Sequence, residues 1–228
     1  MNALVLVDLQ NDFIPGGALA VRAGDQVIPV ARQLMSGAKN FFNYVIATQD
    51  WHPAAHESFA SMHPGRNTGD LITLHGLSQV LWPDHCVQDT KGARFVAGIE
   101  LDKIDAIFQK GKNPQIDSYS GFFDNSSRQN GFVKAEFLHT NSTGLDLWLK
   151  DRNVGKLYVM GLATDYCVKF TVLDALALGF EVEVVLDGCR AVDLTPGDGE
   201  RAIEVMQKNG AKICVSKDLM LLEKREGR

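Results

Sequence analysis

Six short, continuously apolar runs, separated by stretches of helical periodicity, constrain the fold of this chain more than any other feature. Runs of this kind with little polar alternation are typical of parallel strands covered on both faces. Helical patterns lie between them, at about 25–41, 144–150, 165–178 and 198–209. The order predicts an α/β fold, a three-layer αβα arrangement around a roughly six-stranded parallel sheet with right-handed crossovers. The predicted strands are Ala3–Leu9, Tyr44–Asp50, Ala106–Gly111, Lys156–Leu162, Glu181–Gly188 and Lys212–Ser216.

The length of the chain bounds its organisation. At 228 residues, we expect one domain over 1–228, because single α/β domains commonly exceed 200 residues. Two connections, at about 51–101 and 112–143, are too long for simple turns. Loops of this length in a compact domain usually carry function, so we expect them to form the rim of a site. The terminal EKREGR is typical of a frayed, solvated tail.

Composition excludes several classes of protein. The net charge is −5, from 23 basic and 28 acidic residues, and no basic run is present, which argues against nucleic-acid binding. No stretch approaches the roughly 18 apolar residues of a membrane helix. The first ten residues lack the basic lead of a signal peptide. A cytoplasmic location is therefore expected, where the four scattered cysteines stay reduced and free for chemistry.

Reactive side chains follow four of the predicted strands. Asp8 ends the first, Asp50 and His52 end the second, Lys110 ends the third, and Cys167 follows the fourth. Ligands of open parallel sheets bind at the carboxyl ends of the strands. We therefore expect an acid, an acid–imidazole pair, an amine and a thiol at one rim.

Cys167 is the candidate nucleophile. If Thr164 or Asp165 caps the following helix, Cys167 lies in its first turn, where backbone N–H groups favour a thiolate. The same N–H groups can stabilise an oxyanion. Asp8, held by an ion pair with Lys110, can take the thiol proton and return it to a leaving amine. The alternatives are that Cys167 is an inert buried cysteine at a helix start, that Asp8 is a helix cap or part of a structural ion pair, and that Lys110 is a solvated lysine near a turn.

The DWH sequence predicts a metal site. Residues two apart in a strand point to the same side, so Asp50 and His52 can hold one ion, with His85 of WPDHC as a third ligand. Oxygen and imidazole donors suit zinc, iron(II) or manganese, and three protein ligands leave positions open for water or substrate. His56 is a candidate fourth ligand or hydrogen-bonding neighbour, although a lone histidine is more often a simple hydrogen-bonded residue.

These motifs resemble a known family. VDLQNDF, TQDWHPAAHESF, LWPDHCVQ, FQKGKNP followed by DSYSGF, and GLATDYCV resemble the nicotinamidase (pyrazinamidase) branch of the isochorismatase-like cysteine hydrolases, in the family's order and over nearly the whole chain. DWH with WPxHC is the part specific to the branch. Sister amidases resemble this chain at Asp8, Lys110 and Cys167 but usually lack the metal set.

The resemblance implies an activity and assigns roles. Asp8, Lys110 and Cys167 would form a triad hydrolysing nicotinamide, and also pyrazinamide, through a cysteine thioester, in NAD salvage. Backbone N–H groups at Ala163 and Cys167 would bind the oxyanion. A divalent ion, with zinc favoured over iron or manganese, would bind the pyridine nitrogen. Phe13, Trp82, Tyr166 and Ala163 would surround the ring, and the Leu162–Ala163 peptide bond would be cis.

Two other hypotheses stay open at this point. A carbamoyl or ureido amidohydrolase would keep the triad without a contact to a ring nitrogen. A metal-binding module would keep the fold without catalysis. The expected partner is a small molecule rather than nucleic acid or membrane, and the sequence is compatible with a homo-oligomer without fixing the oligomeric state.

Overall fold

The computed structural model describes residues 1–37, 41–129, 132–133 and 141–226, and it contains a six-stranded parallel sheet. Every pairing in this sheet is parallel, which confirms the predicted fold. The strand order is β10-β9-β8-β1-β2-β5. The bounds are Asn2–Val7 (β1), Tyr44–Asp50 (β2), Ala106–Lys110 (β5), Lys156–Leu162 (β8), Glu181–Arg190 (β9) and Lys212–Cys214 (β10).

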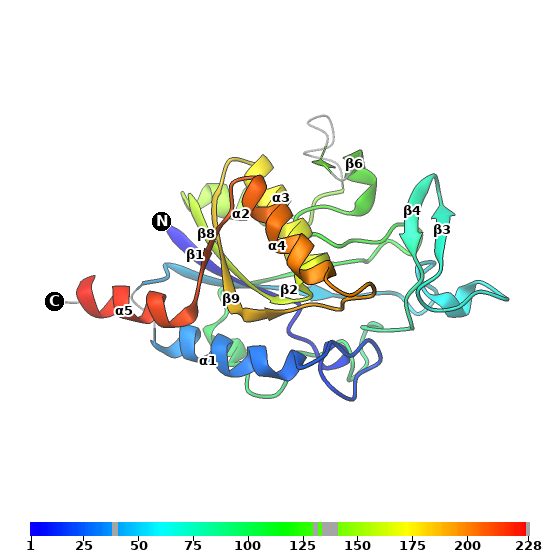
Figure 1. Cartoon of the computed structure of the whole chain (residues 1–228), viewed down its shortest axis with the longest axis horizontal. Coiled ribbons are helices and arrows are strands. Elements are labelled where there is room, and N and C mark those ends of the chain that lie inside the picture. The colour runs from blue at the N-terminus through cyan, green and yellow to red at the C-terminus, as the bar shows by residue number, and fades with distance from the viewer. Residues whose placement is uncertain (38–40, 130–131, 134–140, 227–228) are drawn as a thin grey trace.

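Helices cover both faces of the sheet. α1 (Val27–Gly37) and α5 (Ser216–Glu226) lie on one face, and α2 (Leu145–Asp151), α3 (Lys169–Ala177) and α4 (Asp198–Lys208) lie on the other (Figure 1). The central strand β1 is buried from Ala3 onward, as are most residues of β8. Continuous burial explains why these strands are apolar without alternation. None of the described helices has the length and apolar character needed to cross a membrane.

The C-terminal segment differs from the sequence prediction. Helix α5 extends to Glu226, through most of the segment expected to fray, and Gly227 and Arg228 lie outside the described residues. The helix begins at Ser216, whose backbone N–H and hydroxyl both donate to the carboxylate of Asp187, at 2.9 and 2.5 Å. Leu219 on this helix is buried. A satisfied first turn and a buried side chain stabilise the helix.

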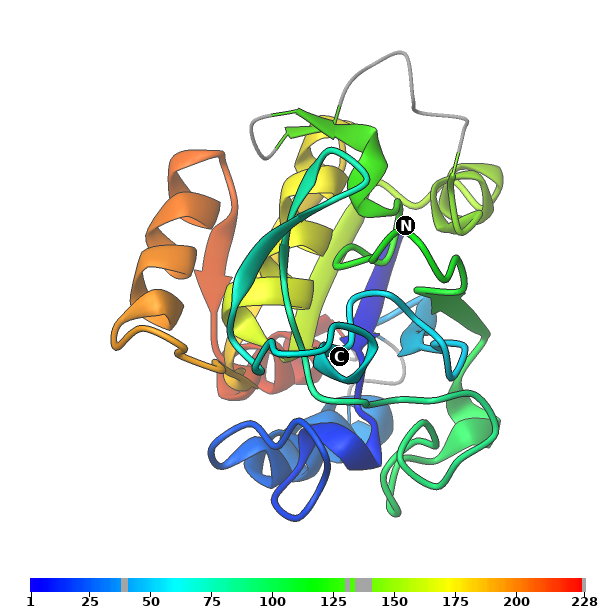
Figure 2. The same cartoon turned by 90° about the vertical axis from the view of Figure 1, so that its right-hand side faces the viewer.

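The two long connections contain structure that the sequence did not predict. Residues 51–101 include an antiparallel hairpin of β3 (Leu71–Leu74) and β4 (Leu77–Val80). This hairpin projects at one end of the molecule in Figure 1 and faces the viewer in Figure 2. The second connection contains the short strands β6 (Arg128–Gln129) and β7 (Phe132–Val133), and its residues 130–131 and 134–140 lie outside the described part of the chain.

The sheet order sets the position of the site. β8, β1, β2 and β5 are consecutive neighbours, and they are the four strands after which reactive side chains were predicted. In the register of β2 with β5, Asp50 is the partner of Lys110. The carboxyl ends of adjacent parallel strands meet at one edge, so the candidate residues gather there.

Candidate active site

Lys110 lies at the centre of a buried cluster of reactive groups. Its Nζ is 3.0 Å from Oδ2 of Asp8 and 3.4 Å from Sγ of Cys167. The same ammonium contacts Oδ1 of Asp50 and donates to the carbonyl of Ser118 at 2.9 Å. The structure therefore brings Asp8, Lys110 and Cys167 together, with Asp50 beside them.

Asp8 is held by β2 as well as by the lysine. It follows β1 with a left-handed φ of 50°. The Thr48 hydroxyl donates to its Oδ1 at 2.6 Å and accepts its backbone N–H at 3.2 Å. Sequence reasoning missed Thr48, although its position two residues before Asp50 on a parallel neighbour of β1 could have indicated it.

The two carboxyl groups beside Lys110 differ in their protonation chemistry. Burial raises the pKa of the Asp8 carboxyl, while the Lys110 ammonium acts in the opposite direction. Burial would also raise the pKa of Asp50, but Lys110 and His52 hold it well below its usual range. Burial disfavours the charge of Lys110, yet Asp50 and Asp8 raise its pKa well above the ordinary value. Asp8 is thus the group suited to exchange a proton, whereas Asp50 and Lys110 stay charged.

Cys167 lies in a π-helical turn, Thr164–Val168, that joins β8 to α3. The N–H groups of Tyr166 and Val168 both donate to the carbonyl of Ala163, at 3.1 Å. Burial raises the pKa of the Cys167 thiol well above its ordinary value, with Lys110 acting in the opposite direction. The pKa shift is therefore opposite to the lowered pKa that the sequence predicted, and a base is needed to take the thiol proton.

The N-cap of this turn is Ala163, rather than the Thr164 or Asp165 considered from the sequence, and Ala163 makes no side-chain capping hydrogen bond. The carboxylate of Asp165 instead accepts the N–H groups of Val192 and Asp193, at 2.9 and 2.8 Å. These N–H groups follow β9 and need acceptors, so Asp165 ties that loop to the turn that carries Cys167. The Leu162–Ala163 peptide bond is cis, as the resemblance implied.

Asp50, His52 and His85 form a set of candidate metal ligands. Oδ2 of Asp50 is 3.5 Å from Nε2 of His52 and 3.7 Å from Nε2 of His85. Their ligand atoms all lie within 4.8 Å of one another. The Nδ1 atoms of the two histidines contact backbone carbonyls, that of Gly111 at 2.9 Å and that of Pro83 at 2.8 Å. A carbonyl on the far nitrogen directs the Nε2 lone pair inward, so these residues fit a divalent ion.

Gly111 is required by this arrangement. Its φ is +66°, and a Cβ at this position would meet Nδ1 of His52 at 2.5 Å. Glycine therefore permits both the left-handed backbone and the close approach of the histidine ring.

His56 lies beside the set. Its Nδ1 is 2.7 Å from the hydroxyl of Ser58, and its buried Nε2 has no hydrogen-bond partner among the described residues. Burial and the neighbouring His52 lower the pKa of His56 to about 4, which keeps the imidazole neutral. The ligand atoms of His52, His56 and Asp117 also lie within 4.8 Å of one another. The sequence analysis did not single out Asp117.

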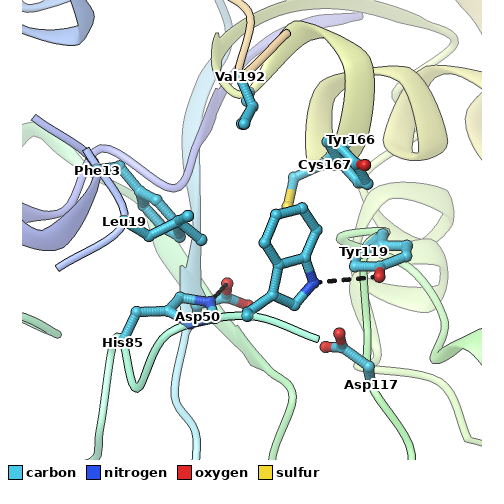
Figure 3. A pocket seen from close by; sticks show the side chains of 11 residues that line it. Phe13, Leu19, Asp50, His85, Asp117, Tyr119, Tyr166, Cys167 and Val192 are labelled. Carbon is cyan, nitrogen blue, oxygen red and sulfur yellow. Dashed lines mark hydrogen bonds and ion pairs between the residues drawn. The ribbon is translucent and has the colours of Figure 1, made fainter. Parts of the chain in front are cut away.

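Aromatic and aliphatic side chains enclose the space in front of Cys167 (Figure 3). The space not filled by atoms there is about 370 Å³, part of it open to solvent. Phe13 packs edge-on against His85, and Trp82 against Tyr166, with ring centroids 5.6 and 4.8 Å apart. The predicted Phe13, Trp82, Ala163 and Tyr166 all line the cavity, and the lining residues not predicted are Leu19, Asp117, Tyr119 and Val192.

The hydrogen bond from Thr48 offers a test of the role of Asp8. It lowers the pKa of Asp8, so Thr48→Val should raise that pKa further. If ionised Asp8 accepts the thiol proton, activity falls as pH drops through this pKa. We expect the acidic limb of the pH profile of kcat/KM to move to higher pH in Thr48→Val. Thr73→Val, on the exposed face of the β3–β4 hairpin, is the control, and an unmoved limb in Thr48→Val would contradict this role.

Comparison with known proteins places the chain in a family. A family model described as the isochorismatase domain matches residues 2–218. The chain belongs to the isochorismatase family. The nicotinamidase of Escherichia coli K12 is 50% identical over 216 residues, 95% of each chain. This level of similarity over nearly the whole length confirms the resemblance to the nicotinamidase branch.

Solved structures of the isochorismatase family agree with this fold. An Acinetobacter baumanii nicotinamidase/pyrazinamidase superposes with a TM-score of 0.85 at 43% identity, covering 96% of this chain and 97% of that one. The pyrazinamidase of Pyrococcus horikoshii, solved in complex with zinc, has a TM-score of 0.72 at 36% identity, covering 94% of this chain and 98% of that one.

Proposed function

We propose that this protein hydrolyses nicotinamide, and also pyrazinamide, to the pyridine or pyrazine carboxylate and ammonia, as one step of NAD salvage. The observation that carries the proposal is the contact of one buried ammonium, Lys110, with Asp8, Asp50 and Cys167. Asp50 belongs at the same time to the candidate metal set. The names of the similar enzymes, nicotinamidase and pyrazinamidase, supply the substrate class.

Cys167 is the proposed nucleophile and Asp8 its base. The thiol proton passes to the Asp8 carboxylate, whose ligand oxygen lies within 4.8 Å of the sulfur. The sulfur then bonds to the amide carbon, and the carbonyl becomes an oxyanion. Asp8 returns the proton to the amide nitrogen, and the C–N bond breaks. Ammonia departs, and the acyl group remains bound to Cys167 as a thioester. Water attacks the thioester carbon while Asp8 takes one of its protons, and the C–S bond then breaks. Asp8 returns that proton to the sulfur, and the acid product leaves as a carboxylate after giving its remaining proton to solvent.

Lys110 and the backbone beside Ala163 are proposed to stabilise the negative charges that form on the sulfur and on the carbonyl oxygen. The Lys110 ammonium offsets the repulsion between the carboxylates of Asp8 and Asp50. It also stabilises the sulfur anion as it forms. The proposed oxyanion donors are the backbone N–H groups of Ala163 and Cys167, at the start of the π-helical turn. Donors fixed by the backbone need no reorganisation when the negative charge develops.

Asp50, His52 and His85 are the proposed holders of a divalent ion, with His56 as a further candidate ligand. Zinc is favoured because a similar pyrazinamidase was solved with it, and iron(II) and manganese also suit these donors. When bound, the ion supplies a Lewis-acidic position for the nitrogen of an aromatic ring. Phe13, Trp82 and Tyr166, at the walls of the cavity, are proposed to hold the ring with its amide toward Cys167.

Removal of the metal is the test that best separates the open hypotheses. We expect chelation followed by desalting to lower kcat/KM for nicotinamide by about tenfold or more, the effect of losing roughly 1.4 kcal/mol of orienting energy. Added zinc should restore the rate, measured as ammonia release with metal analysis of the same sample.

The other hypotheses predict different outcomes. A carbamoyl or ureido amidohydrolase would release ammonia from ureido compounds, and its rate would not depend on the metal. A non-catalytic module would bind zinc tightly and release no ammonia from any amide. Either result would replace the proposed function.

A further inference from the structure

Three consecutive residues after Asp8 direct their side chains to backbone groups of other segments. Gln10, Asn11 and Asp12 lie in the VDLQNDF sequence, and the proposed chemistry uses none of them. Asn11 donates through Nδ2 to the carbonyls of Lys91 and Arg94, both at 2.9 Å. The contacts of Gln10 and Asp12 lead instead to the candidate metal ligands.

Gln10 fixes the backbone of Asp50. Its Nε2 donates to the Asp50 carbonyl at 2.7 Å, and its Oε1 accepts the Asp50 N–H at 2.8 Å. A second hydrogen bond from Nε2 reaches the Ala93 carbonyl at 2.8 Å. Gln10 is fully buried, so these bonds are protected from water. Both polar backbone groups of the proposed ligand Asp50 are therefore held by one side chain from the segment after β1.

Asp12 fixes the segment that carries His85. Its Oδ2 accepts the N–H of Cys86 at 2.7 Å, and its Oδ1 accepts the N–H of Ala18 at 3.2 Å. The carbonyl of Cys86 in turn accepts the N–H of His52 at 3.0 Å. The residue after His85 thus connects both histidines to the Asp12 carboxylate.

The Asp12 carboxylate is closely enclosed. A Cβ added to Gly92 would meet its Oδ2 at 2.0 Å. The left-handed φ of 46° at Cys86 is uncommon for a residue with a side chain, and the hydrogen bond to Asp12 helps to hold it. Glycine at position 92 therefore leaves room for the carboxylate where it accepts the Cys86 N–H.

We propose that Gln10 and Asp12 are positioning residues of the metal centre. Gln10 holds the backbone of Asp50. Asp12 binds the N–H of Cys86, the residue next to His85, and the carbonyl of Cys86 binds the N–H of His52. The same short segment carries Asp8, so one piece of backbone sets both the base and the metal ligands. This inference rests on the metal site of the proposed function, and it predicts that removing either contact weakens binding of a divalent ion.

The experiment measures zinc affinity without any substrate. The full chain, freed of metal, is titrated with zinc against a chromophoric chelator. We expect Gln10→Met and Asp12→Asn to weaken zinc binding by about 10–100-fold, the usual cost of losing a group that orients metal ligands. Asn11→Leu is the matched control for the lost amide. Asp187→Asn is the control for a lost carboxylate, because Asp187 accepts the backbone N–H and the hydroxyl of Ser216 at the start of α5. Both controls should bind zinc within about threefold of the original chain, well inside the range expected of the test variants.

A change in affinity must be separated from a loss of folding. Each variant is therefore unfolded by heat with and without zinc, and the absorption spectrum of the cobalt(II)-loaded protein is recorded. A merely structural role would lower the unfolding temperature of metal-free protein and leave the cobalt spectrum unchanged. If Asp12→Asn does not fold, Gly92→Ala displaces the same carboxylate and should weaken zinc binding likewise.

The outcomes separate this inference from the proposed function. Zinc affinity within threefold of the original chain in Gln10→Met and Asp12→Asn overturns the positioning role, while ammonia release by the original chain still supports the amidase. An original chain that releases ammonia but binds no zinc overturns the metal centre and this inference with it. Weakened zinc binding in the two test variants, with both controls unaffected, supports the inference.

Discussion

Replacing Cys167 by alanine is expected to lower ammonia release from nicotinamide by roughly 10⁴-fold or more, the scale of loss seen when a catalytic nucleophile is removed. Sγ of Cys167 faces the cavity beside Lys110 and Asp8, and alanine offers no atom that can bond to the amide carbon. The change removes little volume and leaves the charged groups in place. The measurement is initial-rate ammonia release at saturating substrate.

Cys214→Ala is the matched control for this variant. Cys214 is a free cysteine on β10, at the edge of the sheet, and its sulfur contacts the Val184 carbonyl at 3.6 Å. We expect its rate to stay near that of the original chain. Zinc binding by Cys167→Ala should also be retained, because Asp50, His52 and His85 are untouched. Undiminished ammonia release in Cys167→Ala would remove the thioester from the mechanism.

Replacing Lys110 by methionine is expected to lower the free energy of unfolding by about 3–5 kcal/mol, the cost of breaking a buried ion pair by removing one partner. Lys110 contacts the carboxylates of Asp8 and Asp50, and all three side chains are buried. Methionine fills similar volume but leaves two neighbouring carboxylates without this cation. Ammonia release should fall with stability, because the sulfur anion loses its neighbouring positive charge.

Urea unfolding at several pH values tests this explanation. Lys110 holds the pKa of Asp50 below its usual range, so its contribution to stability is present above the unfolded carboxyl pKa of about 4 and is lost as pH falls below it. The loss of unfolding free energy in Lys110→Met, relative to the original chain, should therefore be largest near neutral pH and become smaller in acid. The control is Lys103→Met, which removes a partly exposed pair with Glu100 and should change stability little. A deficit that does not depend on pH would point to lost packing instead.

The positions of the strands, and the edge of the sheet at which the candidate residues meet, could be predicted from the sequence. Apolar runs located the six strands to within about two residues, and parallel pairing then required Asp8, Asp50, Lys110 and Cys167 to share one edge. The β3–β4 hairpin was missed because its strands have four residues each and only Gln79 among them is buried, so the hydrophobic alternation of a half-buried strand is weak. Its turn is His75–Gly76, with φ values of 49° and 82°, rather than the Asn-Gly or Asp-Gly sequence that signals a hairpin.

Side-chain hydrogen bonds between segments far apart in the sequence could not be predicted in this way. Gln10, Thr48 and Asp117 each have a hydrogen-bond partner that lies 38 to 83 positions away. Their roles depend on the register of neighbouring strands and on the path of the rim segments. The π-helical turn at Thr164–Val168 likewise depends on the carbonyl of Ala163 accepting two N–H groups, which no residue pattern indicates.

The two oxygens of Asp50 face different partners, Oδ1 the ammonium of Lys110 and Oδ2 the imidazoles of His52 and His85. The Asp50 side chain therefore has two roles, one toward the lysine and one toward the candidate metal site. A descendant that gave up its ion could lose both histidines at modest cost, yet it would still need an acid at position 50 to balance the lysine. Drift at this centre should thus begin with the imidazoles and reach the carboxylate last.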